Sequence, residues 1–129
     1  MSKLNEQTYV NDAEEVIRSL VTENRWGEKE LKLSTSKIRN LLSLISAIYN
    51  DVRQDFSETL SEEIQSRIRY LKVRFVYESG REQDVKEFVK RAKILEYLDE
   101  IGDSRKGFLA FAKYMEALVA YHKYHGGRD

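Results

Sequence analysis

Apolar residues recur at helical spacing in five segments of this 129-residue chain, and this periodicity limits its fold more than any other feature. The segments span residues 10–21, 38–52, 64–76, 85–98 and 108–122. The chain contains no proline, which agrees with helices because proline is excluded from helix interiors. No segment shows the sustained apolar–polar alternation that is typical of strands. The sequence therefore predicts an all-α, single-domain bundle of about five helices.

Polar and small residues mark the expected ends of these helices. Residues 34–36 (Ser-Thr-Ser) are candidate N-caps for the second helix, and Thr59 with Glu62 has capping-box spacing for the third. Gly80 is well placed to end the third helix. Gly27 and its charged neighbours predict a loop after the first helix.

The third segment is apolar on more than one face. Ile68, Leu71 and Phe75 lie on one stripe at helical spacing, whereas Val73 and Val76 lie on the opposite side. A helix that is apolar on several sides is usually enclosed by other elements. We therefore expect this helix to lie at the centre of the bundle.

The length suits one domain with one hydrophobic core, since domains commonly hold about 100–150 residues. We treat residues 1–129 as that domain, with the first helix and a loop in residues 1–33. The chain has no cysteine, which excludes disulfides and thiolate metal sites. The first ten residues form no apolar leader, and no run approaches the ~20 apolar residues of a membrane span. We expect a cytoplasmic protein without a membrane segment.

Positive charge is concentrated in the middle of the chain. Lysine plus arginine and aspartate plus glutamate both number 22, so the net charge is zero. Residues 64–94 nevertheless hold four acidic residues and nine basic ones, which are Arg67, Arg69, Lys72, Arg74, Arg81, Lys86, Lys90, Arg91 and Lys93. This segment is where we expect an anionic partner to bind.

Arginines alternate with tyrosines along one flank of the third helix. At 100° per residue, a sector of about 80° holds Arg67, Tyr70, Arg74, Tyr77 and Arg81. Guanidinium groups pair with phosphate oxygens, and tyrosine rings stack on bases, so the pattern suits a nucleic-acid backbone. The alternative is structural: the tyrosines are half-buried at the core edge, and the arginines pair with Glu63, Glu78 or Glu82.

Two further cations lie at the start of the second helix. Lys37 and Arg39 occupy its first turn, where the helix dipole favours carboxylates over cations. Their placement predicts an anion that meets both the helix-start amides and these side chains. Ordinary surface charge is the alternative explanation.

The sequence offers no active site. No phosphate-binding loop, nucleophile motif or paired-carboxylate motif occurs, and His122 and His125 lack neighbours at metal-ligand spacing. His122 continues an apolar stripe and is expected at the edge of the core. We therefore predict no enzymatic activity, no metal and no cofactor. The surplus aromatic residues of the last helix predict a second packing surface, for a protein partner or for self-association: Tyr114, Tyr121 and Tyr124.

Three segments together resemble a known family. They are STSKIRNLLSLISAIYNDV (34–52), RYLKVRFVYESGREQDVKEFVKRA (69–92) and FAKYMEALVAYHKYHGGRD (111–129). Their order and spacing are similar to those of the small subunit of type III-A CRISPR effector complexes, the second subunit of the Csm complex, and the resemblance covers most of residues 34–129.

The resemblance implies a five-helix bundle without enzymatic activity that works in antiviral and anti-plasmid defence. Several copies would stack along the guide CRISPR RNA and its target RNA, beside the other Csm complex subunits. They would contact RNA mainly through basic residues and without reading its sequence.

Carried over residue by residue, and joined with the flank of the third helix, the resemblance predicts an RNA-binding set. The set comprises Lys37, Arg39, Arg67, Arg69, Lys72, Arg74, Arg81 and Lys86. Which of these face RNA and which face a neighbouring subunit stays open. A protein–protein adaptor whose basic helix docks an acidic partner is the alternative function. A small RNA-processing enzyme that uses His122 or His125 is a second rival.

Overall fold

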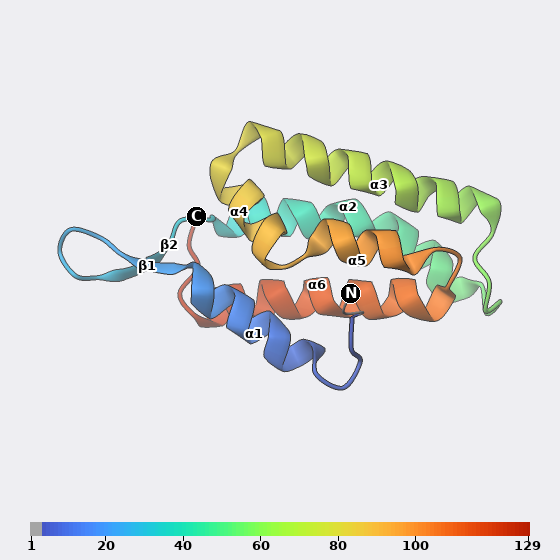
Figure 1. Cartoon of the computed structure of the whole chain (residues 1–129), viewed down its shortest axis with the longest axis horizontal. Coiled ribbons are helices and arrows are strands. Elements are labelled where there is room, and N and C mark those ends of the chain that lie inside the picture. The colour runs from blue at the N-terminus through green and yellow to red at the C-terminus, as the bar shows by residue number, and fades with distance from the viewer. Residues whose placement is uncertain (1–3) are drawn as a thin grey trace.

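A computed structural model describes residues 4–129, which form six helices and one two-stranded antiparallel hairpin (Figure 1). The elements are α1 (Tyr9–Leu20), β1 (Val21–Glu23), β2 (Lys29–Leu31), α2 (Thr35–Gln54), α3 (Glu62–Arg81), α4 (Gln83–Arg91), α5 (Ile94–Ile101) and α6 (Arg105–Tyr124). The predicted all-α class is confirmed. Within the described residues, no helix combines the length and apolar character needed to cross a membrane.

Helix α6 lies at the centre of the bundle. It packs against α1, α2 and α5, and the three 20-residue helices α2, α3 and α6 run along the long axis (Figure 1). Phe108, Phe111, Met115 and Leu118 of α6 are fully buried. The prediction that the third helix is central is wrong, because α3 packs on α2, α4 and α5 while its opposite face is open to solvent.

The predicted fourth helix is two helices. Helix α4 ends at Arg91, and the chain turns at Lys93, which has a left-handed backbone with φ of 56°. The amide of Ala92 still bonds to the carbonyl of Phe88, but helical bonding restarts only at Lys93, whose carbonyl accepts from Tyr97. Both segments bury their apolar faces, so the helical spacing of apolar residues continues across the break. The sequence pattern therefore predicted one helix where the structure has two.

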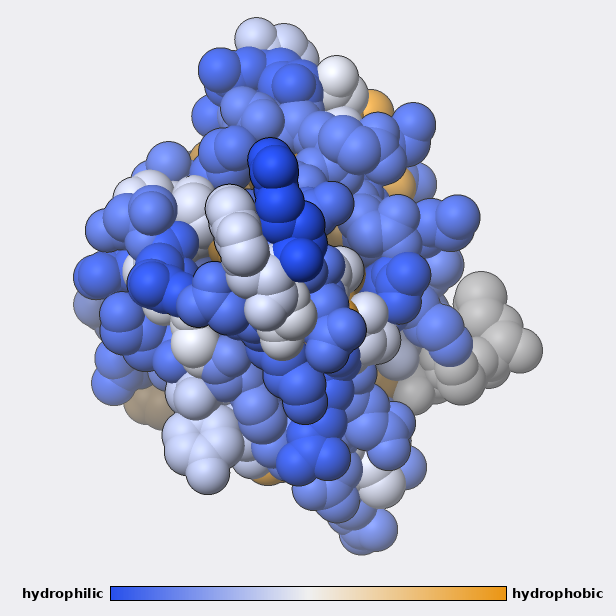
Figure 2. Space-filling model, turned by 90° about the vertical axis from the view of Figure 1, so that its left-hand side faces the viewer, coloured by the Kyte–Doolittle hydropathy of each residue, from blue (hydrophilic) through white to orange (hydrophobic). Residues whose placement is uncertain are grey.

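The predicted loop around Gly27 contains the hairpin. Strands β1 and β2 pair in the register Val21–Leu31 to Glu23–Lys29, and the hairpin extends beyond one end of the bundle (Figure 1). Each strand has three residues, too few for alternation to be recognised in the sequence. Figure 2 looks at this end of the molecule, where the surface is largely hydrophilic and apolar areas are small.

Serines start the three long helices. The hydroxyl of Ser34 accepts from the amide of Lys37, as predicted, and Ser61 and Ser104 cap α3 and α6 in the same way. Ser61 therefore takes the role that the sequence predicted for Thr59. Helix α3 also continues one residue past Gly80.

Hydrogen bonds of residues 126–129 connect the end of α6 to the start of α2. The buried ring of His122 lies with Nε2 2.6 Å from the carbonyl oxygen of Leu33. The amide of Gly127 donates to the carbonyl of His122 at 2.8 Å, and the amide of Thr35 donates to the carbonyl of Arg128 at 3.0 Å. His122 is therefore a core residue, further inside than the predicted core edge.

The hydroxyl of Tyr114 donates a hydrogen bond to the carbonyl oxygen of Ala92, 2.9 Å away, at the break between α4 and α5. Tyr114→Phe is expected to lower the free energy of unfolding by about 1–3 kcal/mol, because that carbonyl would stay buried without its partner. Burial raises the pKa of Tyr114 above its ordinary 10.0. The hydroxyl's contribution is therefore complete below about pH 10 and falls as the pH rises further. Urea unfolding of both proteins at neutral and alkaline pH measures this difference.

Candidate nucleic-acid interface

One flank of α3 lies along α2 and forms a groove with it. Three residues of the predicted arginine–tyrosine flank line this groove, Arg67, Tyr70 and Arg74. Its volume is about 460 Å³, and α2 contributes Leu44, Ala47 and Ile48 to it.

A second groove continues the first toward the end of α3. It has a volume of about 400 Å³ and is lined by Lys37 of α2 and by Arg74 and Arg81 of α3. Both grooves include Leu44 and Arg74, so they adjoin. We call the combined feature the α2–α3 trough; its cations are Lys37, Arg67, Arg74 and Arg81.

Three of the four trough cations already contact a carboxylate. Nη1 of Arg67 lies 2.7 Å from Oδ2 of Asp51, and Nζ of Lys37 lies 3.0 Å from Oε2 of Glu82. A weaker pair joins Arg81 to Glu78 within α3, at 3.3 Å. All three pairs are accessible to solvent, where such pairs contribute only about 0–1 kcal/mol. A phosphate group can therefore replace the carboxylate at small cost.

Arg74 differs from the other three cations. It is half-buried between the two grooves and, within residues 4–129, no carboxylate lies within ion-pair distance of it. Tyr70 and Tyr77 beside it are 62% and 60% exposed, so the alternative that they are half-buried core edge is wrong. The guanidinium of Arg81 lies over the ring of Tyr77, 5.6 Å from its centroid.

The other four residues of the predicted set lie outside the trough. Lys72 is on the α5 side of α3, where its Nζ contacts both carboxylate oxygens of Asp99 at 2.9 and 3.0 Å. Arg39, Arg69 and Lys86 are exposed on α2, α3 and α4. The structure therefore brings together half of the predicted set and leaves the other half dispersed.

The predicted anion at the start of α2 belongs to the chain itself. Oδ1 of Asp129 accepts from the amide of Ser36 at 3.0 Å and from its hydroxyl at 2.7 Å. The side chain of Lys37 turns away to Glu82 and the trough. The helix-start amides thus have partners within the fold, and of the two predicted cations only Lys37 lines the trough, whereas Arg39 is exposed outside it.

Two polar residues of the trough, Asn40 and Ser43, were not predicted from the sequence. Both line the groove on the α2 side. They follow Lys37 at intervals of three residues, a spacing that places all three on one side of the helix. That spacing was the available signal, but the apolar stripe of α2 obscured it.

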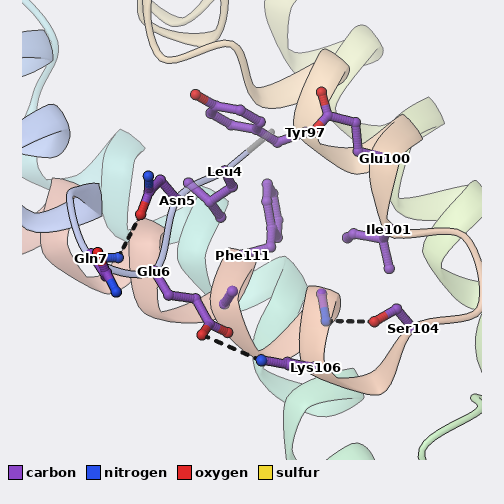
Figure 3. Close-up of a pocket in the computed structure, with 12 residues that line it drawn as sticks. Leu4, Asn5, Glu6, Gln7, Tyr97, Glu100, Ile101, Ser104, Lys106 and Phe111 are labelled. Carbon is purple, nitrogen blue, oxygen red and sulfur yellow. Dashed lines mark hydrogen bonds and ion pairs between the residues drawn. The ribbon is translucent and has the colours of Figure 1, made fainter. Parts of the chain in front are cut away.

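A larger cavity lies elsewhere and has different chemistry. It measures about 690 Å³ and lies between residues 4–7 and helices α5 and α6 (Figure 3). Lys106 is the one cation among its described lining residues, and it lies 3.8 Å from a carboxylate oxygen of Glu6. Within residues 4–129, a buried carboxylate oxygen of Glu100 has no hydrogen-bond partner. An uncompensated carboxylate repels phosphates, so this cavity does not suit RNA.

Both histidines make contacts within the fold. His122 is fully buried, and Gly127 lies directly against its ring. His125 contacts Glu14 of α1, with Nε2 2.8 Å from a carboxylate oxygen. In residues 4–129, no three His, Cys, Asp or Glu side chains gather as a metal site would require.

Comparison with known proteins gives a consistent result. The model of the family described as "Csm2 Type III-A" matches residues 14–128. A Mycobacterium tuberculosis (strain H37Rv) protein named "CRISPR system Cms protein Csm2" is 47% identical over 121 residues, which is 94% of each chain. Proteins of the same name from Streptococcus thermophilus and Enterococcus italicus are 43% and 39% identical, and cover 100% and 96% of this chain and 100% and 94% of their own lengths.

Proposed function

The chain belongs to the Csm2 family of type III-A CRISPR systems, and from this membership we propose that it is a non-catalytic small subunit of the RNA-guided Csm complex, in the cytoplasm. In this role several copies stack along the guide RNA and its captured target RNA. The α2–α3 trough contacts the RNA backbone, and other subunits catalyse the reactions of the defence system.

One observation carries the proposal: four cations from two helices, far apart in sequence, line one continuous trough. Lys37 and Arg67 are thirty positions apart in the chain, yet the packing of α2 on α3 aligns them with Arg74 and Arg81. A linear array of cations matches a linear array of phosphates. The exposed ring of Tyr70, which lines the trough, can stack on bases or bond ribose hydroxyls.

Binding requires little rearrangement. Within residues 4–129 no carboxylate pairs with Arg74, so its guanidinium can bind a phosphate in its present position. Arg67, Arg81 and Lys37 exchange a solvated carboxylate for a phosphate oxygen, which keeps each charge paired. Such contacts involve only the RNA backbone, so they carry no information about the base sequence.

Replacing Arg74 and Arg81 by alanine is expected to weaken RNA binding about 10–100-fold and to leave the bundle folded. Each lost phosphate contact should also reduce the salt slope of a log–log plot by about 0.7–0.9. RNA titrations of the assembled complex at several salt concentrations measure both quantities. Circular dichroism and urea unfolding confirm the fold of the variant.

Lys113→Ala with Lys123→Ala is the matched control, because it removes the same charge from exposed positions of α6 outside the trough. It should leave the affinity and slope near those of the wild type. Equal losses of RNA affinity in both double variants would mean that binding depends only on net charge and not on the trough. Normal binding by the Arg74 and Arg81 variant would favour the adaptor function, in which the same cations dock an acidic protein and RNA does not compete.

A further inference from the structure

The tip of the hairpin exposes a tryptophan on a hydrogen-bonded turn. Oδ1 of Asn24 accepts from the amides of Trp26 and Glu28 at 2.9 and 3.0 Å, and Gly27 completes the turn with φ of 77°. Trp26 is 72% exposed, and the guanidinium of Arg25 lies over its ring at 5.0 Å. These hydrogen bonds order the backbone of the turn, so little backbone entropy is lost when the tip binds.

The charges of the hairpin indicate what it contacts. Glu23, Glu28 and Glu30 outnumber Arg25 and Lys29, so the hairpin carries a net negative charge that repels phosphates. Tryptophan and arginine are enriched among the residues that dominate protein–protein binding. The tip therefore suits a protein surface that is apolar and flanked by cations.

Such a surface exists on the same chain, on the side of α3 that faces away from the bundle. Val73, Val76 and Tyr77 are 56%, 49% and 60% exposed there, and Arg69 lies beside them. Within the described residues, no carboxylate lies within ion-pair distance of Arg69. We call these four residues the outer face of α3. Val73 and Val76 offer RNA neither a hydrogen-bonding group nor a ring, so the apolar part of this face suits a protein.

We propose that Trp26 of one copy docks on the outer face of α3 of a second copy, with the hairpin glutamates near Arg69. This inference rests on the proposed function, in which several copies line one RNA. The hairpin tip and the outer face of α3 are different surfaces. Each copy can therefore dock its tip on one neighbour and receive the tip of another on its outer face, so the contact repeats along a stack. Lys37, Arg67 and Arg74 line the trough on the α2 side, so the contact leaves them open to RNA. Arg81 lies over Tyr77 at the border of the two surfaces, and Arg69 belongs to the protein interface.

One hairpin buries less surface than a stable dimer needs, so the contact forms when RNA has aligned the copies. The experiment therefore uses the reconstituted complex on its guide RNA. A photo-reactive benzoylphenylalanine replaces Trp26, and the complex contains equal amounts of ¹⁵N-labelled and unlabelled copies. Mass spectrometry should find cross-links between position 26 and the α3 segment 70–81, and these should join labelled to unlabelled chains.

The same probe in place of Phe56, which is exposed in the segment between α2 and α3, should not give this cross-link. Val73→Glu with Arg69→Glu should reduce the cross-link at least fivefold. Trp26→Ala should keep the RNA affinity of the free subunit, whereas Arg74→Ala with Arg81→Ala should lose it, which separates this inference from the proposed function. Cross-links from position 26 to RNA, to another subunit or only within one chain would overturn the inference, as would their absence.

Discussion

Assembly on a guide RNA is expected to strengthen RNA binding by this chain about 10²–10⁴-fold over the free subunit. A single trough offers four cations, and three of them must exchange a carboxylate for a phosphate. Copies held side by side on one RNA raise the effective concentration of each trough, so affinity increases without new kinds of contact. Titrating labelled RNA against the free subunit and against the assembled complex measures this ratio.

The same titrations should show little dependence on RNA sequence. Contacts between cations and phosphates are the same for every base, so single strands and guide–target duplexes of unrelated sequence should bind with similar affinity within each class. A scrambled guide paired with its own target is the matched control. Nanomolar, sequence-selective binding by the free subunit would contradict the proposal, because it would require direct contacts with base edges.

Gly127→Ala is expected to lower the free energy of unfolding by about 2–4 kcal/mol. A methyl group at this position would overlap the ring of His122 and approach the His122 carbonyl. Residues 126–129 would have to move off the bundle, which would break the bonds from Thr35 to Arg128 and from Ser36 to Asp129. Urea unfolding followed by circular dichroism gives the free energy, since a bundle of this size should unfold cooperatively.

Gly80→Ala is the control, because we expect it to change the free energy of unfolding in the opposite direction. Gly80 lies in the last turn of α3, and a methyl group there would meet no atom within 4 Å. Alanine favours a helix over glycine by about 0.8–1.0 kcal/mol, so this variant should be slightly more stable than the wild type. Equal stability of the Gly127 variant and the wild type would mean that residues 126–129 contribute nothing to the fold.

Local patterns predicted most of the helices correctly. The apolar series of residues 38–52 corresponds to α2, and the series of residues 108–122 corresponds to α6. Helical spacing also predicted that Arg67, Tyr70 and Arg74 share one flank of α3, and all three line one groove. These predictions succeeded because a helix places its side chains by sequence spacing alone.

Features that depend on single residues or on packing were missed. The break between α4 and α5 rests on the backbone of Lys93, and the hairpin turn rests on hydrogen bonds of Asn24. Tyr114 was expected on a second packing surface with Tyr121 and Tyr124, but it is buried; of the three, only Tyr124 is largely exposed. Helical spacing says which residues share a face, but it does not say what covers that face.

The sequence by itself determined that this chain is helical, which residues share a side of each helix, and that its positive charge lies near α3. Only the tertiary structure decided that Lys37 joins Arg67, Arg74 and Arg81, while Lys72 turns to Asp99 and the start of α2 is occupied by Asp129. Periodicity is a property of neighbouring residues in one segment. The partner of a side chain depends on which helix packs beside it, and that contact joins residues far apart in the chain.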